Sequence, residues 1–152
     1  MEYTKKLKNL NVIVKDSGVK PIGQICTVKE AVPIIRAIFR DLPPDQEHLI
    51  VLFLDNRNNV TGFKCLFSGG QDSSVVDFRV LFRNALLFGA TSIIISHNHP
   101  VGDSTPSDAD RFITTSLIKT GNLLHIPVVD HIIITNNNKT DYFSFKQAKM
   151  MK

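Results

Sequence analysis

The chain has 152 residues, of which 43% are hydrophobic, and carries a formal net charge of +4 with a pI near 9.2. This length supports one sizeable core and is too short for two independent ones, so a single folded domain is expected. No apolar stretch is long enough to span a bilayer, and the first ten residues lack the apolar segment of a secretory signal. We therefore expect a soluble, cytoplasmic protein with no membrane partner.

The cysteine and charge patterns exclude other classes. Cys26 and Cys65 form neither a C-x-x-C pair nor a crowded pattern, which argues against a disulfide framework or an all-cysteine zinc site. The basic residues are scattered along the chain rather than gathered in one stripe. Net positive charge is therefore only weak support for a nucleic-acid partner.

The first 26 residues are predicted to form an N-terminal edge strand and a connection. The β-branched run from Asn11 to Val14 is typical of a short strand, and glycines and prolines follow it. Thr27-Val28-Lys29-Glu30 has the pattern of a capping box, and Ala31 to Phe39 continue with helical spacing until Pro43-Pro44. The main domain is therefore expected over residues 27–152.

The rest of the chain alternates apolar or amphipathic runs with turns rich in glycine, proline and asparagine. The predicted elements are a β-hairpin over 49–54 and 60–67, a helix over 77–88, a buried strand over 91–96, a helix over 107–120, a buried strand over 128–135, and a short final strand with a helical stub. Gly89 and Gly121 stand where the two later helices are expected to stop. This order predicts an α/β (α+β) fold in which helices cover a central mixed sheet in three layers.

Two histidines stand at the end of the buried strand that begins near Thr91. Because side chains alternate along extended backbone, His97 and His99 are expected to project from the same face, with Asn98 on the other. After a loop, Thr105 or Ser107 caps the next helix.

Ser107 and Asp110 are three residues apart in this predicted helix and so share one face of it. One hydroxyl and one carboxylate can thus face the two histidines. Two imidazoles and one carboxylate are a common ligand set for catalytic zinc, which leaves a fourth position for water. The sequence therefore predicts a zinc site made by His97, His99 and Asp110.

A purely structural explanation stays open for the same residues. The histidines could end the strand within a tight turn, while Asp110 pairs with a neighbour such as Arg111. Other zinc patterns do not fit, because the chain has no H-E-x-x-H and no H-x-E combined with P-C-x-x-C.

The spacing from His97 to Asp110 resembles the JAMM motif, H-x-H-x7-S-x2-D, of the JAB/MPN metalloproteases. The wording HNHPVGD and TPSDAD, with SSVVDFRVLFRNAL upstream and VVDHIIIT downstream, is similar to the RadC family from about Thr27 to Phe145. This resemblance implies a JAB/MPN (cytidine deaminase-like) architecture with a curved sheet. It also implies a Zn²⁺-dependent hydrolase that cleaves an amide in an unknown protein or peptide substrate.

The resemblance places the general base at the start of the strand that precedes the motif, where Glu47 stands. The chain has only two other glutamates, Glu2 near the start and Glu30 in the capping box. Glu47 would take a proton from the zinc-activated water and pass it to the leaving amine, and Ser107 would help to stabilise the oxyanion. A solvated glutamate at a strand end is the alternative explanation.

Several other polar residues have weaker predicted roles. The Asp130-His131 pair resembles the same family's downstream pair and could supply a contact to a ligand imidazole, for instance through the carboxylate, or could simply end a loop. Two further histidines, His48 and His125, lack partners at ligand spacing and are expected to be partly exposed. The loop residues Gly69-Gly70 and Ser73-Ser74 could hold an extended substrate or simply be a flexible connection.

The chain departs from the RadC pattern in two places. Asp77-Phe78-Arg79-Val80 stands where the family usually has His-Pro-Arg-Glu, and no segment before Thr27 is expected to have the helical length of the family's N-terminal helix-hairpin-helix-like region. Arg79 and Arg83 could touch phosphate or an acidic peptide but are more simply solvated. Two competing hypotheses therefore accompany the hydrolase: a non-catalytic MPN-like binding module, and a DNA-repair-associated factor.

Overall fold

The computed structural model describes residues 23–69 and 76–152. Its helices are α1 (Val28–Arg40), α2 (Phe78–Leu87) and α3 (Asp108–Leu123), and its strands are β1 (Glu47–Leu54), β2 (Val60–Gly69), β3 (Ser92–His99), β4 (Val128–Thr135) and β5 (Tyr142–Ser144). The edge strand predicted at residues 11–14 lies outside the described residues.

The five strands form one mixed sheet in the order β2-β1-β3-β4-β5. β1 is antiparallel to both β2 and β3, β3 is parallel to β4, and β5 is antiparallel to β4. The β1–β2 hairpin is the one predicted from the asparagine-rich turn. The parallel β3–β4 pair requires a crossover, which α3 supplies.

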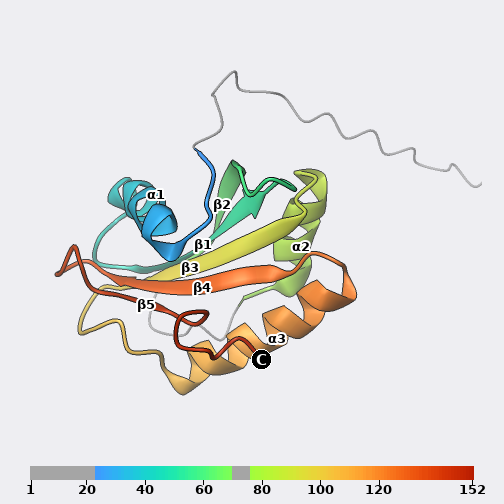
Figure 1. The fold of residues 1–152 in the computed structure, drawn as a ribbon. Coiled ribbons are helices and arrows are strands. Elements are labelled where there is room, and N and C mark those ends of the chain that lie inside the picture. Colours follow the sequence, from blue (N-terminus) through green and yellow to red (C-terminus); the bar gives the residue numbers. More distant parts are fainter. Residues whose placement is uncertain (1–22, 70–75) are drawn as a thin grey trace, which may run out of the picture.

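Helices cover both faces of this sheet, with α1 on one side and α2 and α3 on the other (Figure 1). The side chains of β1 alternate between the two cores: Ile50, Leu52 and Leu54 pack with α1, whereas Leu49, Val51 and Phe53 pack with α2 and α3. A strand buried on both faces has no polar side to show, which explains its continuous apolar sequence. The predicted three-layer α-β-α arrangement is confirmed.

The first two helices begin and end close to their predicted limits. At the start of α1, the Glu30 carboxylate accepts hydrogen bonds from the backbone N–H groups of Cys26 and Thr27, both at 2.8 Å, as the capping-box pattern requires. α1 ends at Arg40, just before the two prolines. Gly89 follows the end of α2 with a φ of 63°, in the left-handed conformation that favours glycine.

The predictions for the end of α3 and for a final helical stub are wrong. α3 continues through Gly121 to Leu123, and Gly121 is needed for space: a Cβ added there would lie 2.5 Å from the backbone oxygen of Ile126. The final stub is a series of hydrogen-bonded turns over residues 145–149, in which Met150 N–H bonds to the Phe145 oxygen at 2.8 Å. Within the described parts of the chain, no helix is both long and apolar enough to cross a membrane.

Candidate metal centre

The end of β3 holds the two histidines on the sheet face that packs against α3. β3 lies between β1 and β4, with His97 opposite Leu49 on one side and Ile133 on the other. Asn98 projects from the opposite face, where its side-chain oxygen accepts from the backbone N–H of His48 at 2.7 Å. This amide fixes the strand end, so the predicted alternation of His97 and His99 around Asn98 holds.

The first turn of α3 positions the carboxylate. Ser107 is the N-cap: its hydroxyl oxygen accepts from the Asp110 N–H at 3.1 Å, while the Ser107 N–H donates to Asp110 Oδ2 at 2.8 Å. This reciprocal capping is the reason for the S-x-x-D spacing. It places Asp110, a residue that is only 3% exposed, with its carboxylate toward the histidines at the end of β3.

Three ligating side chains meet between β3 and α3. His97 Nε2 lies 3.1 Å from His99 Nε2 and 3.1 Å from Asp110 Oδ1, and His99 Nε2 lies 3.5 Å from Asp110 Oδ2. In the described part of the chain, this is the one group of three or more such residues within ligating reach. Zinc bonds of roughly 2.0–2.1 Å in a tetrahedron separate ligand atoms by about 3.4 Å, so these distances fit a metal ion.

The hydrogen bonds of His99 favour a cation between these atoms. His99 Nδ1 lies 2.8 Å from the Asp103 carbonyl, which can only accept, so Nδ1 carries the proton and Nε2 of the neutral ring has a free lone pair. The side-chain hydrogen bond with Asp110 raises the pKa of His99, because an added proton on Nε2 would face the carboxylate. A proton and a metal ion would therefore compete for the same position.

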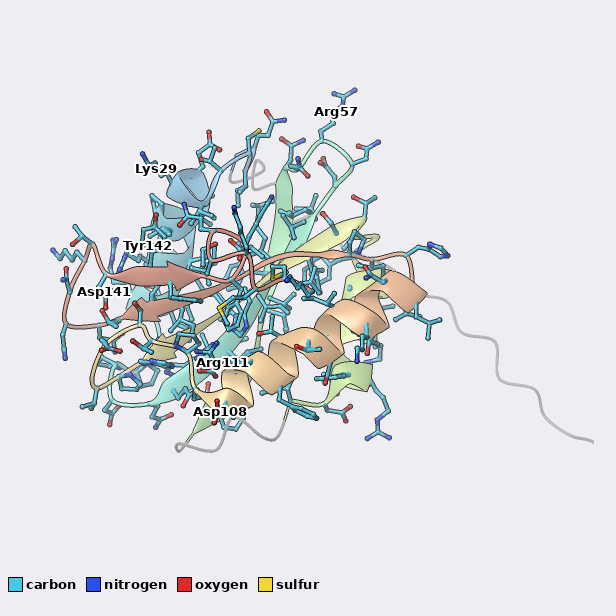
Figure 2. The ribbon with its side chains drawn as sticks, turned by 60° about the horizontal axis from the view of Figure 1, so that its bottom comes forward. Lys29, Arg57, Asp108, Arg111, Asp141 and Tyr142 are labelled. Carbon is cyan, nitrogen blue, oxygen red and sulfur yellow. The ribbon has the colours of Figure 1, made fainter. Side chains whose placement is uncertain are left out.

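Asp110 supplies the negative charge of the cluster. Burial by itself would raise the pKa of Asp110, but hydrogen bonds with His97 and His99 hold that pKa well below its usual range. The neighbouring Arg111 does not compete for this carboxylate. It lies at the surface with its Nε 4.0 Å from Asp108 Oδ1, and Figure 2 shows both side chains on the first turn of α3. The alternative pairing of Asp110 with Arg111 is therefore absent.

Glu47 is the first residue of β1, in a half-buried position opposite Gly69 of β2. Burial raises the pKa of its carboxyl group, and the charges of His97, Asp110 and His99 act on it as well, the histidines lowering and the aspartate raising that pKa. Since β1 is antiparallel to β3, the start of β1 lies at the same edge of the sheet as the end of β3. The structure thus places Glu47 beside the three ligating residues.

His131 of β4 is the residue of the predicted Asp-His pair that touches a candidate ligand. Its Nε2 lies 2.8 Å from His97 Nδ1, and its Nδ1 lies 2.6 Å from the Thr114 hydroxyl of α3. Burial lowers the pKa of His131 well below the usual histidine value. Neither Thr114 nor the Asp103 carbonyl was identified from the sequence. One signal could have indicated Thr114, because it stands four residues after Asp110 and so lies on the same face of the helix.

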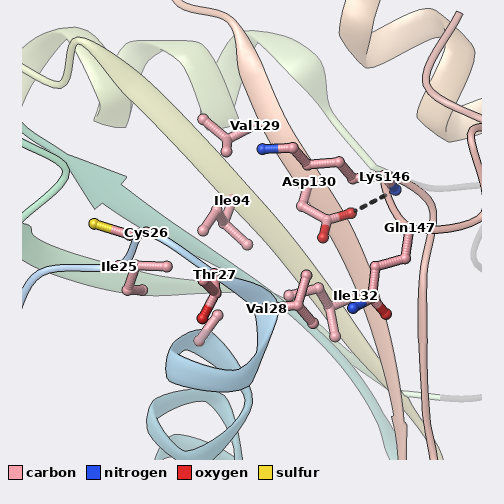
Figure 3. Close-up of a pocket in the computed structure, with 11 residues that line it drawn as sticks. Ile25, Cys26, Thr27, Val28, Ile94, Val129, Asp130, Ile132, Lys146 and Gln147 are labelled. Atoms are coloured by element: carbon pink, nitrogen blue, oxygen red, sulfur yellow. Dashed lines mark hydrogen bonds between the residues drawn. The ribbon is translucent and has the colours of Figure 1, made fainter.

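Asp130, the carboxylate considered for that role, faces the opposite side of the sheet. It lines a pocket of about 210 Å³ between β4 and α1 (Figure 3). There it accepts from the Ser144 hydroxyl at 2.6 Å and from the Lys146 N–H at 3.0 Å. It therefore holds the chain after β5 and does not orient His97.

The remaining candidates lie away from the cluster or outside the described residues. His48 is buried, with 1% exposure, so the expectation that it is partly exposed is wrong. His125 is exposed in the turn after α3, as expected. Arg79 forms a surface ion pair with Asp77 at 2.9 Å. The Asp77 carboxylate already occupies the guanidinium, so Arg79 is a weaker candidate for binding phosphate. Residues 70–75, including Ser73-Ser74, lie outside the described parts.

The three-layer domain, with a His-His-Asp cluster between a central strand and the next helix, defines a JAB-type domain with a candidate metal site. A sequence model described as RadC-like JAB domain matches residues 25–150. The chain belongs to this RadC-like JAB domain family.

Curated relatives support the same assignment. A UPF0758 protein of Flavobacterium johnsoniae is 40% identical over 124 residues, covering 82% of this chain and 52% of the relative. A UPF0758 protein of Clostridium beijerinckii is 38% identical over 136 residues, covering 90% of this chain and 56% of the relative. The chain therefore spans about half the length of the curated relatives it matches.

Proposed function

We propose that this chain is a zinc-dependent hydrolase of the JAMM type, a metallopeptidase or isopeptidase that cleaves an amide in a protein or peptide substrate. The observation that carries the proposal is the convergence of His97 Nε2, His99 Nε2 and the Asp110 carboxylate beside the half-buried Glu47. Three protein ligands would leave a bound zinc ion one position for chemistry, whereas structural zinc sites are closed by four protein ligands.

The ligand residues would hold the ion, and zinc, when bound, would supply Lewis acidity that activates water and polarises the amide carbonyl. Glu47 would accept the proton of the attacking water and return it to the leaving amine. A carboxyl group with a raised pKa suits both halves of this transfer better than an ordinary glutamate.

Ser107 would act on the substrate carbonyl. Its hydroxyl oxygen already accepts from the Asp110 N–H, which orients the side chain and leaves the hydroxyl proton to donate elsewhere. Donation to the oxygen that becomes negative would stabilise the transition state. No serine or cysteine nucleophile is needed, so the reaction would proceed without a covalent intermediate.

The test is a Glu47→Gln variant, which keeps the size of the side chain and removes the base. Purified wild-type protein with zinc is screened against peptide and isopeptide libraries, and the variant is assayed on any substrate found, with zinc content measured in both. We expect activity to fall by about 10²–10⁴-fold with zinc retained. Unchanged turnover in the variant would remove Glu47 from the mechanism.

The same variant separates the competing hypotheses. A binding module or a DNA-associated factor would keep its partner affinity in Glu47→Gln and in metal-stripped protein, and would show no hydrolysis in the wild type. A DNA role would also require an affinity that falls with salt and is lost on charge reversal at Arg79 and Arg83.

A further inference from the structure

We propose that His131 is a positioning residue for the metal: together with Thr114 it fixes the proton of His97 on Nδ1, so that the Nε2 lone pair of His97 faces the ligand cluster. The inference rests on the metal centre of the proposed function and not on the hydrolysis. It starts from the hydrogen bond between the Thr114 hydroxyl and the Asp110 backbone carbonyl, which can only accept.

That first hydrogen bond lies within α3. The Thr114 hydroxyl oxygen lies 2.6 Å from the Asp110 backbone oxygen, and a carbonyl can only accept, so the single hydroxyl proton of Thr114 is used there. His131 Nδ1 lies 2.6 Å from the same hydroxyl oxygen. Since Thr114 has no second proton to give, His131 Nδ1 must carry the hydrogen of this bond.

The next link passes from His131 to His97. His131 is 1% exposed, and its ring stacks on that of Phe145, with centroids 4.8 Å apart and planes 7° apart. The hydrogen of this ring lies on Nδ1, and neither ring nitrogen contacts a carboxylate that would hold a second one. His131 Nε2 is therefore an acceptor, and His97 Nδ1, 2.8 Å away, is the donor. A neutral His97 is then left with an unprotonated Nε2.

This chain of bonds closes on the site itself. It begins at the backbone carbonyl of Asp110, whose side chain is one ligand, and ends at the ring of His97, which is another. It also ties α3 to β4 and β4 to β3. The direction of every bond is the one that metal binding needs, so the site would be oriented before the ion arrives.

The neutral partner has an electrostatic consequence. Ligand histidines commonly donate to a carboxylate, which adds negative charge and makes the ligand more basic. His131 orients His97 without adding charge, so the ligand set of two imidazoles and one carboxylate leaves a divalent ion with a net charge of about +1. A metal that keeps positive charge is the stronger Lewis acid.

The experiment uses Thr114→Val and Thr114→Ser as a matched pair, with His131→Leu and His131→Gln beside them. Valine keeps the shape of threonine and removes the hydroxyl, serine keeps the hydroxyl, and the glutamine oxygen can still accept from His97. Zinc affinity is measured by competition with a chelator. Thermal unfolding of each metal-free protein confirms that it is folded.

Removing the positioning partner should weaken zinc binding by about 10–100-fold in His131→Leu. Thr114→Val should weaken it in the same direction, while Thr114→Ser stays near wild type and His131→Gln recovers part of the loss. In the zinc-loaded wild type, ¹H–¹⁵N spectra of the imidazole nitrogens should place the protons of His97 and His131 on Nδ1. A merely structural role would not dictate these proton positions.

Equal zinc affinity in Thr114→Val and Thr114→Ser, or a proton on His131 Nε2 in the loaded protein, would overturn the proposal. Failure of the wild type to bind zinc would overturn it together with the metal centre. A protein that binds zinc and shows the predicted pattern but hydrolyses nothing would support the positioning role and count against the peptidase alone.

Discussion

Glu47 shows how one carboxyl group can be adjusted by its surroundings. Its half-buried place at the start of β1 raises its pKa, the two histidines oppose that effect, and Asp110 adds to it. Desolvation is the largest of these influences, so the net shift is upward. The pKa of Glu47 is therefore closer to neutral than that of an exposed glutamate, which suits a group that transfers protons.

The pH dependence of activity follows from this shift. A carboxylate that acts as base is active above its pKa and inactive below it, so kcat/KM should rise with pH through a midpoint above the ordinary value of 4.5. Zinc content is measured at each pH, because loss of metal also lowers activity in acid. A midpoint at or below 4.5 with zinc fully bound would contradict the role given to Glu47.

His48 illustrates a residue whose importance is structural. Both ring nitrogens are engaged, Nδ1 with the Ser68 hydroxyl at 2.6 Å and Nε2 with the Pro43 oxygen at 2.7 Å. We expect His48→Leu to lower the free energy of unfolding by about 1–3 kcal/mol, because buried polar partners lose their hydrogen bonds. Chemical denaturation measures this, with His125→Asn at the exposed turn as the control. Equal effects at the two positions would contradict it.

At the scale of elements, Ser107 at the start of α3 is both the N-cap of the helix and a proposed residue of the catalytic site. Ser107→Ala should cost about 0.5–2 kcal/mol of stability through loss of the cap, whereas glycine is a tolerated N-cap and should cost only a few tenths. Both variants lack the hydroxyl, so both should lose activity by a similar factor if Ser107 stabilises the oxyanion. Activity that follows stability, with Ser107→Gly near wild type, would assign Ser107 to capping alone.

The end of α3 depends on the absence of a side chain. Replacing glycine by alanine within a helix ordinarily adds up to about 1 kcal/mol of stability. At Gly121 the added methyl would meet the Ile126 oxygen at 2.5 Å, so we expect Gly121→Ala to be destabilising by about 1–3 kcal/mol. Asn122→Ala, at an exposed neighbouring position, is the control in thermal or denaturant unfolding. A stabilised Gly121→Ala protein would contradict this account.

Local sequence signals predicted most of these elements and missed contacts that depend on packing. The capping box at Thr27 and the apolar run at 128–135 identified α1 and β4, because both signals lie within one segment. Gly121 was misread as a helix stop, since its reason is the close passage of the chain at Ile126, which no local pattern contains. His48 was misjudged because Ser68 and Pro43 reach it only through the hairpin and the preceding loop.

At the scale of the whole molecule, the site lies between two of the three layers, the sheet and the helix α3. The ligand spacing from His97 to Asp110 was readable because a strand, a loop and a capped helix adjoin in sequence. The His131–Thr114 link was not, because it requires β4 to lie beside β3 and α3 to cover both. In the Asp130-His131 pair, the histidine and not the carboxylate contacts His97, because the two residues project from opposite faces of the sheet.

The most direct test of the central claim is the metal content of the purified protein. Elemental analysis of wild type, His97→Ala and Asp110→Ala, prepared without chelators, should find about one zinc per chain in the wild type and none in either variant. Circular dichroism shows whether the variants remain folded. A wild-type protein that contains no stoichiometric metal, and takes up none when zinc is added, would contradict the metal centre and the hydrolase built on it.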